Sequence, residues 1–231
     1  GGVLGGGAGA VPTALGAMTN RQLVIGSTSA TPVVAALTEG ANITITNGAG
    51  TITIASATGV SDQLSGLALS NNGTDATNDI DIALGIAASN DAAYADRVMM
   101  SLTAAITKQL DAAWAVGTNA GGLDTGTIAN TTYHVFLIKR TDTGVVDALF
   151  STSATAPTRP ANYTRSRGIG AIVRSAGAIL GFVQDADLFQ LNTPVLDVDA
   201  NNPGTGAVTR TLTVPIGIQV IARLNGHATS T

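Results

Sequence analysis

The sequence of 231 residues contains no cysteine, which excludes disulfide bonds and thiolate metal sites. It contains two histidines, His134 and His227, so few side chains are available as a general base. No apolar run approaches the ~20 residues of a membrane-spanning helix, and we predict no membrane insertion. These shortages leave little catalytic machinery in the chain.

Charge is also scarce. Charged residues make up 11% of the chain, against about 25% in typical globular proteins. Glu39 is the single glutamate, and Lys108 and Lys139 are the only lysines. The polar surface must therefore consist of Thr, Ser, Asn and Gly, which favour strands and turns over helices. Because such a surface resists association weakly, we expect part of it to be buried against copies of the same chain.

The charge balance argues against a nucleic-acid partner. The net charge is −4, and no basic block occurs. Arg159, Arg165, Arg167 and Arg174 lie near one another in the sequence, but only Tyr163 among them could stack on a base. We interpret these arginines as solvated groups that flank a strand, and we predict no nucleic-acid binding.

Two tandem segments, 132–150 and 167–185, carry the clearest structural pattern. In the first, arms rich in β-branched and aromatic residues flank the turn 141–144, which predicts a β-hairpin. The second repeats this design around the turn 175–178. Half of the chain's aromatic residues lie in these arms, so we expect the core to form here.

The N-terminal part has a different character. Residues 1–20 are rich in Gly and Ala and have too little apolar bulk to fold alone. Isoleucine alternates with threonine over 42–54, which predicts a hairpin with one apolar face. An isolated hairpin is marginally stable in water, so this face must pack on another copy or another protein. The predicted trimer interface consists of four side chains: Ile43, Ile45, Ile52 and Ile54.

The segment from 90 to 114 is compatible with either a helix or a strand. Apolar residues recur every four positions, but that step drifts by ~40° per repeat and would wind around a helix. Because residues 98–107 also alternate, we favour a strand there. Further strands are predicted at 79–84, 189–191, 194–198, 208–214 and 216–224.

These patterns predict an all-β fold in three regions. An N-terminal linker and shaft-like hairpin module occupies 1–58, and a polar linker occupies 59–78. An antiparallel β-sandwich follows over 79–231, since short strands at this spacing are typical of sandwiches. The abrupt start and end suggest a segment of a longer protein.

Several stretches resemble a domain of tail-fibre and other tail structural proteins of tailed bacteriophages. They are residues 121–158 (GGLDTGTIANTTYHVFLIKRTDTGVVDALFSTSATAPT), 167–191 (RGIGAIVRSAGAILGFVQDADLFQL) and 206–224 (GAVTRTLTVPIGIQVIARL). Residues 105–118 (AITKQLDAAWAVGT) are similar to the same family. Residues 12–54 resemble the linker and hairpin modules that such proteins carry upstream.

The resemblance implies a homotrimeric fibre or appendage of the virion. Its expected partners are copies of itself, other phage tail or baseplate proteins, and a glycan or protein on the host cell surface. The resemblance transfers no catalytic, cofactor-binding or metal-binding residue to this chain. Such domains usually continue past the final strand predicted here, so a C-terminal part is expected to be missing.

Few residues suggest chemistry. His134 falls within a predicted strand, on the same face as Phe136, which favours a packed or interfacial histidine over a catalytic base. His227 lies in a polar tail. Sugar-binding sites stack aromatic rings, but Trp114 is flanked by Ala and Val, as expected of a core anchor. Besides Trp114, Tyr94 and Tyr163 are the aromatic residues that could offer an exposed ring to a sugar.

Two pairs of carboxylates bear on an enzymatic alternative. Asp185 with Asp187, and Asp197 with Asp199, are spaced so that both members would share one face of a strand, as paired carboxylates of a glycosidase require. We interpret them as caps of turns or strand ends. A calcium loop starting at Asp197 would need a glycine and a glutamate where Asn202 and Val208 stand. No metal site is predicted.

The sequence therefore supports the hypothesis of a virion structural protein, a tail fibre or similar appendage that contributes to host adhesion. No enzymatic activity and no cofactor are predicted. A head-attached fibre or decoration protein is the first alternative, and a polysaccharide-cleaving tailspike is the second.

Overall fold

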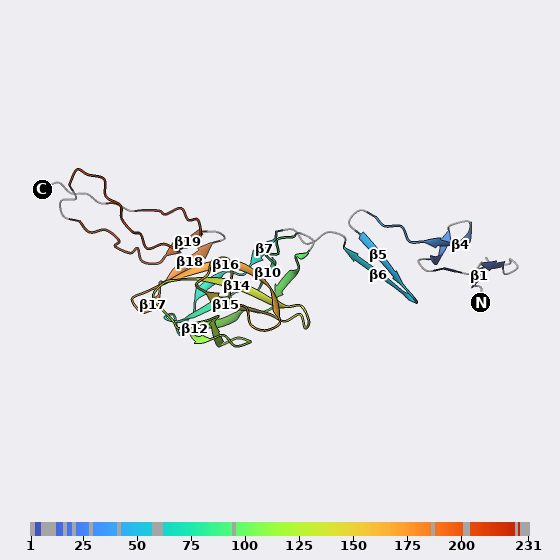
Figure 1. Cartoon of the computed structure of the whole chain (residues 1–231), viewed down its shortest axis with the longest axis horizontal. Helices are drawn as coiled ribbons and strands as arrows, with labels where there is room; N and C mark the ends of the chain where they lie inside the picture. Colours follow the sequence, from blue (N-terminus) through green and yellow to red (C-terminus); the bar gives the residue numbers. More distant parts are fainter. Residues whose placement is uncertain are drawn as a thin grey trace. The chain divides into compact units, whose positions relative to one another are not determined.

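The computed structural model describes residues 3–5, 13–15, 18–19, 22–27, 30–40, 43–56, 62–93, 96–185, 188–200, 204–224 and 226. Every regular element in these residues is a β-strand, which confirms the all-β class (Figure 1). The chain divides into two compact units, residues 1–59 and 60–231. In the part of the chain that is described, no helix is long and apolar enough to span a membrane.

The first unit consists of two-stranded hairpins. Strand β1 (Val3–Gly5) pairs with β2 (Thr13–Leu15), β3 (Gln22–Ser27) with β4 (Ala30–Ala36), and β5 (Ile43–Gly48) with β6 (Thr51–Ser56). Each pair forms a sheet of its own. Little apolar surface is therefore covered within the unit, as expected of a chain rich in Gly, Ala and Thr.

The second unit contains most of the strands and an eight-stranded sheet in the order β17-β16-β14-β15-β13-β12-β9-β8. A three-stranded sheet, β11-β10-β7, and the pair β18-β19 complete it. Its strands are β7 (Leu64–Gly66), β8 (Leu69–Asn71), β9 (Asp79–Ile82), β10 (Gly85–Ala88), β11 (Met99–Leu102), β12 (Ile106–Ala113), β13 (Ala120–Leu123), β14 (Thr132–Arg140), β15 (Val146–Ser151), β16 (Tyr163–Ser175), β17 (Ala178–Ile179), β18 (Phe182–Asp185) and β19 (Leu188–Leu191).

The first predicted hairpin is confirmed. Strands β14 and β15 pair antiparallel from His134↔Ser151 to Lys139↔Val146. Gly144 closes the turn at φ 78°, and its N–H donates to the carbonyl of Arg140 (3.0 Å). A positive φ at this position suits glycine, which explains the Asp-x-Gly signal in the sequence.

The second predicted hairpin is largely wrong. Strand β16 pairs with β17 over only two residue pairs, Arg174↔Ile179 and Ser175↔Ala178. Along the rest of its length β16 pairs with β14, and β18 pairs with β19. The predicted turn does form, with Ala176 and Gly177 both at positive φ. Strand β14 occupies one edge of β16 and β17 the other, and the chain after β17 leaves that second edge, so the predicted hairpin stays short.

The ambiguous segment contains strands, as favoured, but two of them instead of one. Strand β11 ends at Leu102 and β12 begins at Ile106, and the two belong to different sheets. Strand β11 pairs with β10, whereas β12 pairs with β9. The alternation of apolar residues continues through the break, so the pattern alone does not reveal it.

Two further expectations differ from the structure. The predicted polar linker 59–78 contributes β7 and β8 to the sheets of the second unit, and Leu67 and Leu69 are buried in the core. The large sheet is also mixed, not purely antiparallel, because β13 runs parallel to both β12 and β15. Polar residues flank these two leucines in the sequence, which hides the short strands.

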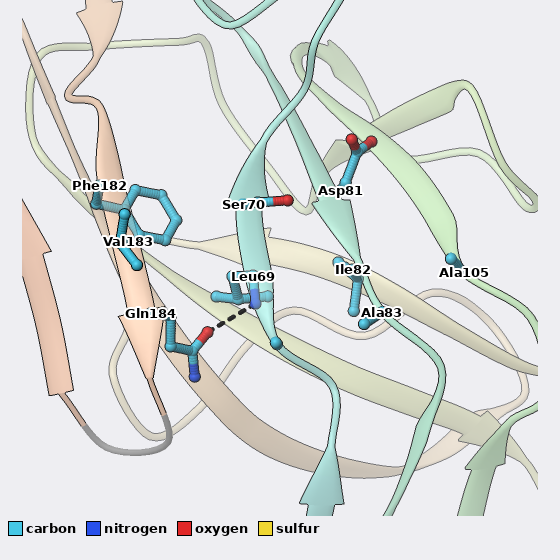
Figure 2. Close-up of a pocket in the computed structure, with 10 residues that line it drawn as sticks. Leu69, Ser70, Asp81, Ile82, Ala83, Ala105, Phe182, Val183 and Gln184 are labelled. Carbon is cyan, nitrogen blue, oxygen red and sulfur yellow. Dashed lines mark hydrogen bonds between the residues drawn. The ribbon is translucent and has the colours of Figure 1, made fainter. Parts of the chain in front are cut away.

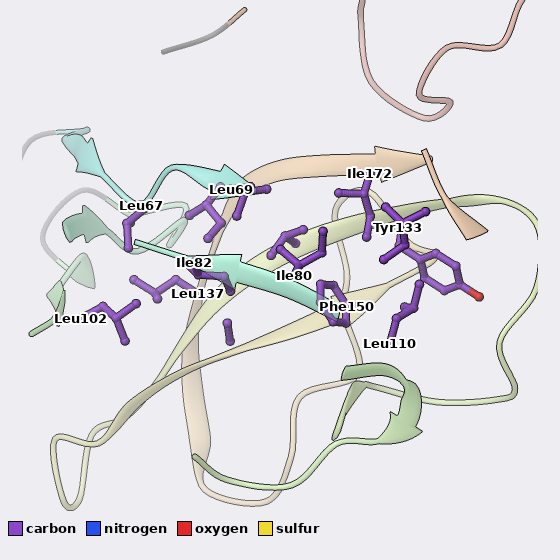
Figure 3. Close-up of a cluster of buried hydrophobic side chains, with 14 of the residues drawn as sticks. Leu67, Leu69, Ile80, Ile82, Leu102, Leu110, Tyr133, Leu137, Phe150 and Ile172 are labelled. Atoms are coloured by element: carbon purple, nitrogen blue, oxygen red, sulfur yellow. The ribbon is translucent and has the colours of Figure 1, made fainter. Parts of the chain in front are cut away.

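The main core lies on one face of the large sheet (Figure 3). On β14, Tyr133, Val135 and Leu137 belong to this core, while Phe136 and Ile138 belong to a smaller cluster. Successive residues of β14 therefore enter two different clusters, as expected of a strand covered on both sides. The labelled core residues in Figure 3 include Leu67, Leu69, Ile80, Ile82, Leu102, Leu110, Phe150 and Ile172.

The C-terminal strand predictions at 194–198, 208–214 and 216–224 are wrong for the single chain. The described residues after β19 contain no strand, and Figure 1 draws them as coil. Apolar side chains such as Val208, Ile221 and Leu224 are exposed by 57%, 95% and 68%. A strand needs a hydrogen-bonding neighbour, and no described strand pairs with this segment.

Gly121 provides a test of the β12–β13 contact. A Cβ added there would lie 1.9 Å from the carbonyl oxygen of Ala113, whereas one added at Gly73 would meet nothing within 4 Å. We expect Gly121→Ala to lower the free energy of unfolding by about 1–3 kcal/mol, because backbone must move to accommodate it. Urea denaturation of both variants measures this. Equal stability of Gly121→Ala and the control Gly73→Ala would contradict the close approach.

Candidate functional site

The predicted interface residues lie on one face of the β5–β6 hairpin. Ile45 is directly opposite Ile54, and Ile52 is opposite Asn47. Because side chains alternate along a strand, Ile43 shares this face as well. Ile43, Ile52 and Ile54 are exposed by 39%, 36% and 61%, while Ile45 is 9% exposed. The hairpin thus presents an apolar face that the first unit covers incompletely.

The C-terminal segment is a second apolar surface. Between residues 195 and 224 the exposed large apolar side chains are 39% to 95% accessible. The predicted strands at 194–198, 208–214 and 216–224 cover all of these residues, so their exposure was not predicted. They are Val195, Leu196, Val198, Val208, Ile216, Ile218, Val220, Ile221 and Leu224.

His134 lies where this segment touches the large sheet. The N–H of Ile216 donates to the hydroxyl oxygen of Thr132 (3.0 Å), and a Cβ added at Gly217 would be 3.4 Å from Nε2 of His134. His134 is 4% exposed. Burial lowers the pKa of His134, and a hydrogen bond with the backbone of Ile216 opposes this partially. It is therefore a packed histidine, in a position that agrees with the prediction.

A buried ion pair joins β12 to β15. Nζ of Lys108 lies 3.4 Å from Oδ1 of Asp147, and it donates to the carbonyls of Ala115 (2.6 Å) and Gly117 (3.2 Å). Both side chains are almost fully buried. Burial lowers the pKa of Lys108, and Asp147 counteracts that shift. Two of its partners are backbone carbonyls and the third is the buried Asp147 carboxylate. This lysine therefore positions the chain after β12 and is not free for chemistry.

Trp114 completes this cluster. Its ring packs edge-on against Tyr163 at a centroid distance of 5.1 Å, and its Nε1–H donates to the carbonyl of Ala148 (3.0 Å). Nζ of Lys108 lies 5.4 Å from the ring centroid. Trp114 is thus a packing residue, as predicted. Tyr163 is also buried, contrary to expectation, and Tyr94 lies outside the described residues.

The candidate carboxylates among the described residues differ in their surroundings. Asp197 accepts hydrogen bonds from the N–H (2.9 Å) and the hydroxyl (2.6 Å) of Thr213, which lower its pKa. Asp199 is exposed, and Asp187 lies outside the described residues. In the part of the chain that the structure describes, no three His, Cys, Asp or Glu side chains gather to hold a metal. His227 is also outside that part.

A mainly apolar cavity of about 390 Å³ lies between β8, β9 and β18 (Figure 2). Oε1 of Gln184 accepts from the backbone N–H of Leu69 (2.6 Å) across it. Asp81 is the one carboxylate of its lining, and it already accepts from Asn72 (2.8 Å) and Thr107 (2.6 Å). With a single bonded carboxylate, the lining offers no acid–base pair for glycoside cleavage.

Of the four arginines that are close in sequence, Arg174 separates from the other three in the structure. Arg165 and Arg167 lie beside the chain after β10, where Nη1 of Arg165 is 2.6 Å from Oδ1 of Asp91. Arg174 lies at the other end of β16 and donates to Asn130 and Gly177. Arg159 contacts Thr164 and Ser166. Asp91, the acidic partner of Arg165, lies far from it in the sequence, so no local pattern reveals this ion pair.

Comparisons with known proteins give no family for this chain: no family model, no curated protein and no solved structure matches it.

Removal of Lys108 tests the buried pair. We expect Lys108→Met to lower the free energy of unfolding by about 3–5 kcal/mol, because Asp147 would remain buried without its cation. Urea denaturation measures the loss. Asp142→Asn, which breaks the exposed Arg140–Asp142 pair, is the control and should change stability little. A loss in Lys108→Met no larger than in the control would contradict the structural role of the pair.

His134 predicts a pH dependence of stability. Its pKa in the folded chain lies below the ordinary value of 6.5, so the unfolded chain binds the proton more readily. Stability should therefore fall as the pH drops through about 6.5, by at most ~1.4 kcal/mol per pH unit. His134→Gln, which does not titrate, should show a flatter dependence between pH 7.5 and 5.5 in urea denaturation. Parallel curves for the two proteins would refute this assignment.

Proposed function

We propose that the chain is a structural protein of a tailed-bacteriophage virion, a tail fibre or similar appendage that contributes to host adhesion. It works as a homotrimer, docked to other tail or baseplate proteins, with a sandwich-like domain after a shaft-like N-terminal hairpin. The proposal assigns no catalysis and no cofactor to the chain. It combines the sequence resemblance with the exposed apolar surfaces of the single chain.

The observation that carries the proposal is the amount of β-forming apolar sequence that one chain leaves uncovered. Ile43, Ile52 and Ile54 are exposed on the hairpin, and the alternating residues of 208–224 have no strand partner among the described strands. Large exposed apolar patches mark interaction sites in soluble proteins. Identical chains around a three-fold axis would place their isoleucine faces together, so that all three apolar faces are covered at once.

The shaft interface is tested by charge on the isoleucine face. We expect Ile45→Asp/Ile52→Asp to convert the trimer into monomers while the second unit stays folded, because six carboxylates would have to be buried together. Sedimentation equilibrium should give about three times the 22.9 kDa chain mass for the unmodified protein and about one time for the variant.

The matched control carries the same charge on the opposite face of the same hairpin. Thr44 and Thr53 occupy the equivalent diagonal positions, so Thr44→Asp/Thr53→Asp should remain trimeric. Circular dichroism of both variants checks that the second unit is folded. An intact trimer in the isoleucine variant, or a monomeric unmodified chain, would refute the assembly.

A further inference from the structure

A polar cavity of about 290 Å³ lies where three segments of the second unit meet. The chain after β10, the connection between β15 and β16, and strand β16 itself each contribute to its wall. This volume is near the lower end of the ~300–1,000 Å³ of small-molecule sites. The lining includes five polar or charged side chains and one proline: Asn90, Asp91, Thr155, Arg159, Ser166 and Pro157.

The walls are held in place by hydrogen bonds. The N–H of Asn90 donates to the carbonyl of Ser166 (2.8 Å), which ties the chain after β10 to β16. Asp91 accepts from Arg165 (2.6 Å) and from the hydroxyl of Ser89. Its carboxylate is therefore neutralised and bonded, so it contributes shape to the cavity without repelling an anion strongly.

Arg159 is the group with unused capacity. It is exposed at the cavity, and both of its hydrogen bonds, to the carbonyl of Thr164 (2.9 Å) and the hydroxyl of Ser166 (3.4 Å), use the same nitrogen, Nη1. A guanidinium has five N–H donors, and a planar pair of them fits a carboxylate in two parallel hydrogen bonds. Among the described residues no carboxylate pairs with Arg159.

The surroundings add positive charge. Arg97 and Arg167 share a single carboxylate, that of Asp62, and Arg165 pairs with Asp91. Arg159 therefore lies beside two ion-paired arginines, Arg165 and Arg167, in a chain whose net charge is −4. The local excess of positive charge favours an anionic ligand over a neutral one.

We propose that this cavity binds a carboxylate-bearing saccharide, with Arg159 on the carboxylate and Asn90, Thr155 and Ser166 on ring hydroxyls. Amide and hydroxyl groups match a polyhydroxylated ligand because they both donate and accept hydrogen bonds. The ring of Pro157 offers a small apolar surface to the ligand. This inference deepens the proposed function and rests on it, because the saccharide site would serve host adhesion only in a virion appendage.

Isothermal titration calorimetry with trigalacturonic acid tests the site on the whole 231-residue chain, with neutral maltotriose as the comparison ligand. We expect the acidic trisaccharide to bind and maltotriose to bind at least ten-fold more weakly. Arg159→Gln should weaken binding of the acidic trisaccharide at least ten-fold, while Arg174→Gln, the same change at the far end of β16, should not. Thermal unfolding of both variants confirms that they are folded.

Four results would overturn the site. They are no binding of trigalacturonic acid, equal binding of maltotriose, unchanged binding by Arg159→Gln, and equally tight binding of a trinucleotide, which a general anion site would explain. Sedimentation equilibrium on the same samples separates this inference from the assembly. A trimer that fails to bind refutes the saccharide site alone, whereas a monomer that binds refutes the assembly alone.

Discussion

The backbone of an extended segment must find hydrogen-bonding partners, and its apolar face must find a cover. Strand β14 meets both demands within one chain, since β15 and β16 flank it and clusters of buried side chains cover both its faces. The isoleucine hairpin meets only the first demand. The segment 204–224 has no strand partner among the described strands, and most of its large apolar side chains are exposed. Because of this unequal coverage, we propose that the working surfaces of the molecule lie at contacts between chains.

The buried pair of Lys108 and Asp147 shows how the second unit tolerates charge. A lysine without exposed surface is costly, yet here it satisfies two carbonyls and a carboxylate beside an indole ring. The connection between β12 and β13 is thereby fixed, and β13 can enter the sheet parallel to both neighbours. Charge in this chain is scarce, and this buried pair joins β12 to β15 within the sheet.

Sequence reasoning succeeded where the pattern was local. The β14–β15 hairpin, the strands at 79–84 and 189–191, and the packed roles of His134 and Trp114 follow from alternation and from neighbouring residues. It failed where pairing partners are distant in the sequence. Strand β16 pairs along most of its length with β14, and β7 and β8 are short strands between polar residues. The polar cavity was missed for the same reason, because Asn90 and Asp91 reach Arg159 and Ser166 only through the fold. The predicted strands at 208–214 and 216–224 do not form in the single chain, because alternation alone does not make a strand: a strand also requires a hydrogen-bonding neighbour.

The central claim is that other copies of the chain supply that neighbour, and hydrogen–deuterium exchange of the backbone amides in 208–224 tests it most directly. In the assembled protein these amides should exchange slowly, because they would be paired between chains, and protection should disappear on dilution to the monomer. Fast exchange of this segment at concentrations where the protein is assembled would contradict the account.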